Sequence, residues 1–280
     1  MVIACYAGVG KSTFARKYTA ETIDLYSMPF SWILPEKTDG EFEDVKAAPY
    51  LLRNPAFPDN YIAAILRAEQ NYKYVLIPTI CSVLEELYET HKLPYVICYP
   101  RIELKEEYSS RYMDRGNTAD FTAIFIDQWE DRIQMLMNDR NGKHFRLESG
   151  MFLTDMKDEI DLAMESVHVD PKIMAVRSRE IMELNEIAET KMRQGCISIM
   201  GPGLTHYYFP LDFRKPENRK WAYELGKICY ENNIFIGTDD VQWLETFYDH
   251  EYGSDPNVIR KFHDKQEVMD YCRNRGDTEL

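Results

Sequence analysis

The residues best suited to chemistry form a glycine-rich run close to Met1. Two glycines followed by Lys-Ser-Thr are typical of a phosphate-binding loop, in which main-chain N–H groups donate to phosphate oxygens. In such a loop Lys11 reaches the β- and γ-phosphates of the nucleotide, and the hydroxyl of Ser12 binds Mg²⁺. The pattern therefore predicts that ATP binds here with Mg²⁺. The predicted cofactor-binding residues are Ala7, Gly8, Val9, Gly10, Lys11, Ser12 and Thr13.

The elements on both sides of this run are those that a phosphate-binding loop requires. The preceding residues, MVIACY, are apolar enough for a short buried strand. The following TFARKYTAETI places apolar residues near helical spacing and predicts a helix. The alternative, a chance Gly-Lys-Ser turn opening an ordinary helix, does not account for a strand, a glycine turn and a helix in this order.

One residue departs from the usual pattern. Cys5 lies six positions before Lys11, where phosphate-binding loops normally have glycine. The N–H cradle is formed by the backbone, so it depends on Gly8, Gly10 and the start of the helix more than on this side chain. Because cysteine is also small, we expect the loop to bind a nucleotide.

The rest of the first half alternates apolar strands with helices. KYVLIPTI and PYVICYP are typical of buried strands, NYIAAILRAEQNY and CSVLEELYETHKL of helices, and the Pro-rich residues 34–60 of a long loop. This alternation predicts an α/β fold with a parallel sheet and helices on both of its faces. Ligands bind beyond the carboxyl ends of such strands, so the loops after Tyr6, Ile23, Ile77 and Tyr99 should converge on one site.

A carboxylate at the end of the second predicted strand is the candidate acid of this site. Asp24 could bind the metal together with Ser12, or it could accept the proton of an attacking hydroxyl. The alternative is that Asp24 only caps a turn. The next strand ends at Pro78 and Thr79 without an acidic residue, which departs from motor-type ATPases and fits smaller kinases better.

Basic residues after the fourth predicted strand suit a lid that closes over transferring phosphates. Arg111 and Arg115 are one helical turn apart in YPRIELKEEYSSRYMDRGN and so share one face. Arginine matches phosphate through planar, bidentate hydrogen bonds, and closure excludes water, so we predict a lid around residues 100–117. In the alternative, the two arginines pair on the surface with Glu107 and Asp114. The predicted catalytic residues are Lys11, Asp24, Arg111 and Arg115.

Four stretches together resemble the P-loop nucleotide-kinase-like proteins of phages and bacteria: AGVGKST, NYIAAI, CYPRIELKEEYSSRYMDRGN and FRLESGMFLTDM. That group includes phage kinases that act on nucleotides or on modified DNA bases. The resemblance covers roughly residues 1–160 and implies that Arg111 and Arg115 belong to a lid and that Asp24 is the metal or acceptor acid. The residues that it assigns to the phosphate cradle of ATP are Gly8, Gly10, Lys11, Ser12 and Thr13.

The second half is predicted to form a smaller α+β domain. SREIMELNEIAETKMRQG is typical of a helix, and CISIM, THYYFPLDF and IFIG are typical of short strands. No motif in this half indicates a function, and GPGLTHYYF is better explained as a tight turn than as a ligand loop. We therefore predict a nucleotide-kinase-like domain over 1–160 and a domain of unassigned role over 161–280.

Composition and charge limit the classes of partner. The chain has 280 residues, 45% of them hydrophobic, and a formal net charge of −14. This acidic balance disfavours an extended nucleic-acid backbone and favours a small acceptor. No apolar run is long enough to span a membrane and no secretory signal is expected, so we expect a cytoplasmic protein. The cysteines form no CxxC pair and are expected to be reduced, and the oligomeric state is left open.

Two functions are compatible with these patterns. The first is a phosphotransferase that moves the γ-phosphoryl group of MgATP to a nucleotide-like acceptor, either a free nucleoside or nucleotide or a modified base. The second is an interaction module that binds ATP or GTP with little or no turnover, which the missing acid after Thr79 and the unassigned second half favour. A guanine-specific GTPase is disfavoured because the sequence contains no N/TKxD. We expect the kinase.

Overall fold

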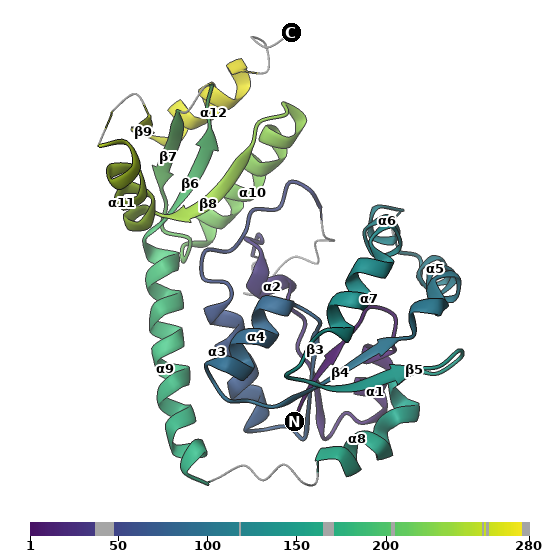
Figure 1. Ribbon diagram of the computed structural model, residues 1–280. Helices are drawn as coiled ribbons and strands as arrows, with labels where there is room; N and C mark the ends of the chain where they lie inside the picture. Colours follow the sequence, from purple (N-terminus) through teal and green to yellow (C-terminus); the bar gives the residue numbers. More distant parts are fainter. Residues whose placement is uncertain are drawn as a thin grey trace. The chain divides into compact units, whose positions relative to one another are not determined.

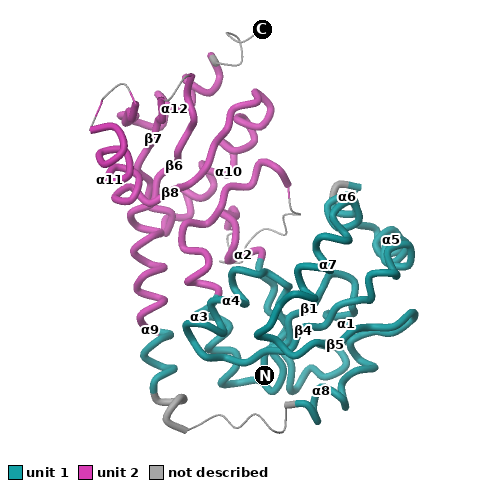
Figure 2. Tube along the Cα trace, in the orientation of Figure 1, with its two compact units in different colours: residues 1–27, 62–181 teal, residues 28–61, 182–280 magenta. Residues whose placement is uncertain are grey.

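The computed structural model describes residues 1–36, 48–117, 119–164, 171–202, 205–253, 255 and 258–275. The chain divides into two compact units (Figure 2). The first contains residues 1–27 and 62–181, and the second contains residues 28–61 and 182–280. The predicted long loop includes residues 37–47 and the predicted turn in GPGLTHYYF includes residues 203–204, so both expectations lie partly outside the described residues.

The first unit is built on a five-stranded sheet in which every strand is parallel to its neighbours (Figure 1). Its order is β2-β3-β1-β4-β5. The inner strands are unbroken apolar runs because they are covered on both faces. The predicted α/β fold with a parallel sheet is therefore confirmed for this unit. The strands are β1 (Val2–Cys5), β2 (Thr22–Asp24), β3 (Tyr74–Pro78), β4 (Tyr95–Pro100) and β5 (Lys143–Leu147).

Helices cover both faces of this sheet. Phe14 of α1 packs edge-on against Tyr74 of β3, with ring centroids 5.3 Å apart. Tyr95 of β4 is in register with Val75 of β3, and successive residues of a strand point to opposite faces, so Tyr95 lies on the face opposite to Tyr74. Its hydroxyl donates to Asp139, which follows α7. The helices and 3₁₀ turns of this unit are α1 (Lys11–Lys17), α4 (Cys81–Glu89), η1 (Ile102–Leu104), α5 (Lys105–Asp114), α6 (Ala119–Asp127), α7 (Trp129–Met137), η2 (Leu153–Met156) and α8 (Lys157–Met164). Helices α3 (Asp59–Glu69) and α9 (Pro171–Arg193) each contribute residues to both units.

Two features of this unit are not indicated by the local sequence pattern. The apolar stripe in NTADFTAIFIDQWEDRIQMLM is typical of one continuous helix, but the helix is broken at Gln128, between α6 and α7. Trp129 at the break is buried, and its indole N–H donates to the carbonyl of Ile102 over 2.7 Å, which satisfies its one donor. The strand β5 has no counterpart in the prediction, because as an edge strand it mixes exposed basic residues with buried apolar ones.

The second unit contains a four-stranded sheet in the order β8-β6-β7-β9. Strand β6 is antiparallel to both β7 and β8, whereas β7 and β9 are parallel. Strands β6, β7 and β8 overlap the three short strands that the sequence indicates. The elements are α2 (Met28–Ser31), β6 (Gly195–Met200), β7 (His206–Pro210), α10 (Pro216–Glu231), β8 (Ile236–Asp240), α11 (Val241–Tyr252), β9 (Ile259–Lys261) and α12 (Lys265–Arg275).

Residues 28–61 group with this second unit, whereas the sequence prediction places them in the domain over 1–160. The N–H of Ile33 donates to the carbonyl of Leu52 over 2.8 Å, which holds the two ends of the segment together. Both side chains are buried in one hydrophobic cluster with Ile197 and Leu225. These contacts join residues that are far apart in the chain, so no local pattern indicates them.

Candidate functional site

The glycine-rich run connects β1 to α1 at the carboxyl end of the parallel sheet, where a ligand site is expected. Gly8 and Gly10 have φ angles of +86° and +94°, in the left-handed region that favours glycine. A Cβ on Gly8 would lie 2.9 Å from the ring of Tyr112, and one on Gly10 would lie 3.2 Å from the ring of Phe152. Both positions therefore require glycine, for backbone conformation and for space.

Several main-chain N–H groups of the run have no hydrogen-bond acceptor within the described part of the chain. The N–H of Val9 approaches the carbonyl of Tyr6 at 3.4 Å, and that of Phe14 donates to the carbonyl of Gly10 at 2.9 Å. The N–H groups around them are left for an external acceptor, such as phosphate oxygens. They belong to Gly8, Gly10, Lys11, Ser12 and Thr13.

Lys11, Ser12 and Asp24 meet at one point, although they come from α1 and β2. The ammonium of Lys11 forms an ion pair with one carboxylate oxygen of Asp24. The hydroxyl of Ser12 donates to the other carboxylate oxygen over 3.1 Å. The side chains of Lys11 and Asp24 are 20% and 23% exposed, so solvent or a ligand can reach them. The carboxylate of Asp24 thus contacts two residues of the glycine-rich run, Lys11 and Ser12.

This arrangement supplies donors of the kind that Mg²⁺ prefers. Proteins usually bind Mg²⁺ through one or two carboxylates together with substrate phosphates and water. The carboxylate of Asp24 and the hydroxyl of Ser12 are two such oxygen donors, 3.1 Å apart. Among the described residues, no group of three or more His, Cys, Asp or Glu side chains could hold a metal alone. A magnesium ion at Asp24 would therefore complete its coordination with phosphate and water oxygens.

Arg111 is held against the glycine-rich run. Its guanidinium donates to the carbonyl of Gly8 over 3.4 Å and to the carbonyl of Met151 over 3.1 Å, and it pairs with Glu107. It also lies 4.2 Å from the ring centroid of Phe152. Burial raises the pKa of Glu107, but hydrogen bonds from the segment after β5 and the charge of Arg111 outweigh this and hold the pKa below its usual value. The ion pair between Arg111 and Glu107, which the surface-pair alternative predicts, is present. Arg111 also joins α5 to the glycine-rich run.

Arg115 is in a different environment from Arg111. It follows the last residue of α5, its side chain is exposed, and that side chain forms no hydrogen bond or ion pair with any described residue, Asp114 included. Between the two arginines, the hydroxyl of Tyr112 donates to the carbonyl of Ala7 over 3.0 Å, which gives α5 a second attachment to the loop. The two arginines that the sequence treats as a pair therefore differ in exposure and in partners.

Cys5 ends β1, just before the loop. Its thiol is buried, and burial raises its pKa to about 12, with the charge of Lys11 opposing this shift and that of Asp24 adding to it. The thiol is therefore neutral at physiological pH and adds no charge beside the glycine-rich run.

A Cys5→Gly variant should bind MgATP with equal or higher affinity, because the variant restores the usual loop residue and leaves the N–H cradle unchanged. Isothermal titration with MgATP measures the affinity. Cys98→Gly is a matched control, because Cys98 is the register partner of Cys5 on β4 and is also buried. A marked loss of affinity in Cys5→Gly alone would show that the thiol contributes to the site.

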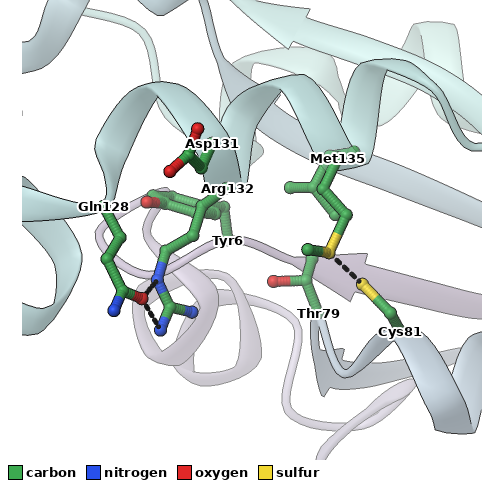
Figure 3. Close-up of a pocket in the computed structure, with 8 residues that line it drawn as sticks. Tyr6, Thr79, Cys81, Gln128, Asp131, Arg132 and Met135 are labelled. Carbon is green, nitrogen blue, oxygen red and sulfur yellow. Dashed lines mark hydrogen bonds between the residues drawn. The ribbon is translucent and has the colours of Figure 1, made fainter.

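A pocket of about 260 Å³ adjoins the loop and is lined by residues that the sequence prediction missed (Figure 3). Tyr6 follows β1 and Thr79 follows β3, so the carboxyl ends of two neighbouring strands meet here, and α7 supplies further lining residues. The available signal was a polar pair four residues apart at the start of α7: Arg132 donates to the side-chain oxygen of Gln128, the residue before the helix, over 3.1 and 2.9 Å. The lining residues are Tyr6, Thr79, Cys81, Gln128, Asp131, Arg132, Met135 and Leu136.

Comparison with known proteins identifies no family for this chain. No protein-family model matches this chain, and no curated protein matches it either. No helix of the described residues is both long and apolar enough to cross a membrane. The function must therefore be inferred from the arrangement of the residues themselves.

Proposed function

We propose that this chain is an ATP-dependent phosphotransferase, in which the glycine-rich run is a phosphate-binding loop and a nucleotide-like acceptor receives the γ-phosphoryl group of MgATP. The observation that carries this proposal is the meeting of Lys11, Ser12 and Asp24 beside a run of unbonded N–H groups. A cation, a hydroxyl and a carboxylate at one point match the groups that a bound magnesium nucleotide uses in P-loop proteins.

Each of these residues has a separate role in the proposal. The free N–H groups bind oxygens of the β- and γ-phosphates. The ammonium of Lys11 leaves its ion pair with Asp24 and binds the phosphates, where negative charge develops during transfer. Ser12 and Asp24 would hold Mg²⁺, which would neutralise charge shared by the two phosphates. Arg111 keeps α5 against the loop through the carbonyl of Gly8.

The transfer exchanges one phosphorus–oxygen bond for another. The acceptor oxygen forms a bond to the γ-phosphorus, the bond between that phosphorus and the β–γ bridging oxygen breaks, and ADP leaves with the electron pair. The proton of the acceptor hydroxyl passes to the carboxylate of Asp24 or to water.

A binding module with little turnover is the second candidate, and one observation favours it. Strand β3 ends at Pro78 and is followed by Thr79, so neither residue supplies a carboxylate beside the loop. Acceptor-dependent release of ADP separates the two candidates. We expect ADP release to rise when nucleosides or nucleotides are added, as measured with a coupled enzyme assay. MgATP binding without acceptor-dependent ADP release would support the module and contradict the kinase.

An Asp24→Asn variant should lower kcat by about 10²-fold or more while ATP binding in the presence of EDTA stays unchanged, because the amide is a poorer magnesium ligand and a poorer base. Steady-state kinetics over a range of Mg²⁺ concentrations measure the effect. Glu21→Gln removes an exposed carboxylate from the turn before β2 and serves as the control. Parental kcat in Asp24→Asn would remove this residue from the site.

A further inference from the structure

We infer that the pocket between Tyr6, Thr79 and α7 binds the phosphoryl acceptor, and that this acceptor is an uncharged, hydroxyl-bearing molecule of nucleoside size. This inference names the acceptor of the proposed phosphotransferase and therefore rests on that proposal. It draws on the position of the pocket, on its charge and on its volume.

The position of the pocket suits an acceptor that must meet the γ-phosphate. Tyr6 lines the pocket and directly precedes the glycine-rich run, so the pocket and the loop share a wall. Thr79 lines it from the end of β3, the strand next to β1. Ligands of parallel sheets bind at such carboxyl ends. A molecule here would therefore lie beside the phosphates of a nucleotide held by the loop.

The charges of the lining residues cancel. Arg132 is the one cation and Asp131 the one carboxylate among the described residues that line the pocket, and the guanidinium already donates twice to Gln128. Tyr6 and Cys81 stay neutral because burial raises the pKa of both groups, that of Tyr6 to about 12. A phosphomonoester brings about 1.5–2 negative charges, which this lining cannot balance. An uncharged acceptor brings no charge that the lining would have to balance.

The polar atoms of the pocket suit a ligand that carries a hydroxyl group and a ring with nitrogen and oxygen atoms along one edge. The hydroxyl of Tyr6 is buried and meets no hydrogen-bond partner at bonding geometry among the described residues, although the nearby hydroxyl of Tyr112 helps to lower its pKa. The carboxylate of Asp131 accepts no hydrogen bond within those residues either. In Figure 3, Gln128 and Arg132 lie on one side of the pocket and Met135 and Cys81 on the other. The first side offers donors and acceptors, and the second offers sulfur and apolar surface.

The volume limits the size of the acceptor. At about 260 Å³ the pocket is slightly below the usual range of small-molecule sites. A single nucleoside is the largest unit that this space suits. Longer nucleotide chains would have to extend outside it.

Cys81 provides a test that does not depend on catalysis. It lines the pocket and is exposed, whereas the other five cysteines are buried, so an alkylating reagent should modify Cys81 selectively in the folded protein. Burial raises its pKa, so the reaction is run at mildly alkaline pH with iodoacetamide and followed by mass spectrometry. Cys81→Ser, which should give no fast adduct, identifies the labelled residue.

We expect at least one of the common nucleosides, at millimolar concentration, to slow Cys81 alkylation fivefold or more, and its 5′-monophosphate to slow it less. Lack of protection by every nucleoside, or stronger protection by the monophosphates, overturns the inference. Because the experiment needs no ATP, protection in a protein that releases no ADP would keep the pocket assignment and remove the kinase. Acceptor-dependent ADP release without protection of Cys81 would support the kinase and contradict the pocket assignment.

Thr79→Val provides a second test of the same site, because it removes a hydroxyl from the pocket and keeps the shape of the side chain. We expect its KM for the acceptor to rise tenfold or more while the Kd of MgATP is unchanged. Thr90→Val, at the other end of α4, is the matched control and should behave like the parent. Equal acceptor KM values in the two variants would contradict the assignment.

Discussion

A Lys11→Met variant should lose nearly all phosphoryl transfer, with kcat about 10²–10³-fold below that of the parent. Methionine keeps an unbranched side chain that is only one atom shorter and removes the cation, so the variant tests mainly the charge. In the resting structure that cation is paired with Asp24. Lys11 is the only cation of α1 that lies next to both Ser12 and Asp24, because Arg16 and Lys17 lie in the last turn of the helix.

The measurement is kcat with saturating MgATP and acceptor, together with the melting temperature. Lys17→Met is the matched control, because Lys17 is an exposed lysine on the same helix that lies over the ring of Tyr18 and not at the loop. Parental turnover in Lys11→Met would overturn the phosphate-loop interpretation. A large decrease in the melting temperature with unchanged turnover would show that the ion pair between Lys11 and Asp24 has a structural role.

Arg111→Ala should lower both stability and turnover, whereas Arg115→Ala should lower turnover alone. Arg111 donates to two main-chain carbonyls and pairs with Glu107, so its removal should cost about 1.5–3 kcal/mol and loosen α5 from the loop. Arg115 has no partner to lose among the described residues. If it reaches the phosphates only when α5 closes, its loss affects the transition state and leaves the Kd of ATP unchanged.

Three quantities measured on each variant separate these roles: kcat, the Kd of ATP and the melting temperature. Arg111→Lys keeps the charge but cannot make the same set of directed hydrogen bonds, so it should resemble Arg111→Ala in stability. Unchanged kcat in Arg115→Ala would remove Arg115 from the lid. Unchanged stability in Arg111→Ala would show that the contacts with Gly8 and Met151 contribute little.

The sequence predicted the part of the site that a local pattern encodes. Continuous apolar runs identified strands β1, β3 and β4, because strands covered on both faces need no polar alternation. The spacing of Gly8, Gly10 and Lys11 identified the loop, because the turn demands those residue types. The position of Asp24 at a strand end predicted that it lies near the loop, since the carboxyl ends of parallel strands share one edge of the sheet.

Features that depend on distant contacts could not be predicted in this way. The pocket brings together Thr79 and Arg132, which lie on separate elements, and each looks ordinary in its own segment. Next to the break at Gln128, the indole of Trp129 donates to the carbonyl of Ile102, which lies well before it in the chain. The different roles of Arg111 and Arg115 arise from the segment after β5, which packs beside only one of them.

The grouping of residues 28–61 with the second unit has a consequence for biosynthesis. Ile33 and Leu52 leave the ribosome early, but the cluster that buries them also needs Ile197 and Leu225. At translation rates of about 5–20 residues per second, that wait lasts roughly 10–30 s. All five strands of the first unit have been synthesised before this interval ends, so that unit can form its sheet while the apolar side chains of Ile33 and Leu52 stay exposed and open to chaperones. A pause in translation before β6 would lengthen this exposure and should lower the yield of native protein, whereas a pause after α12 should not.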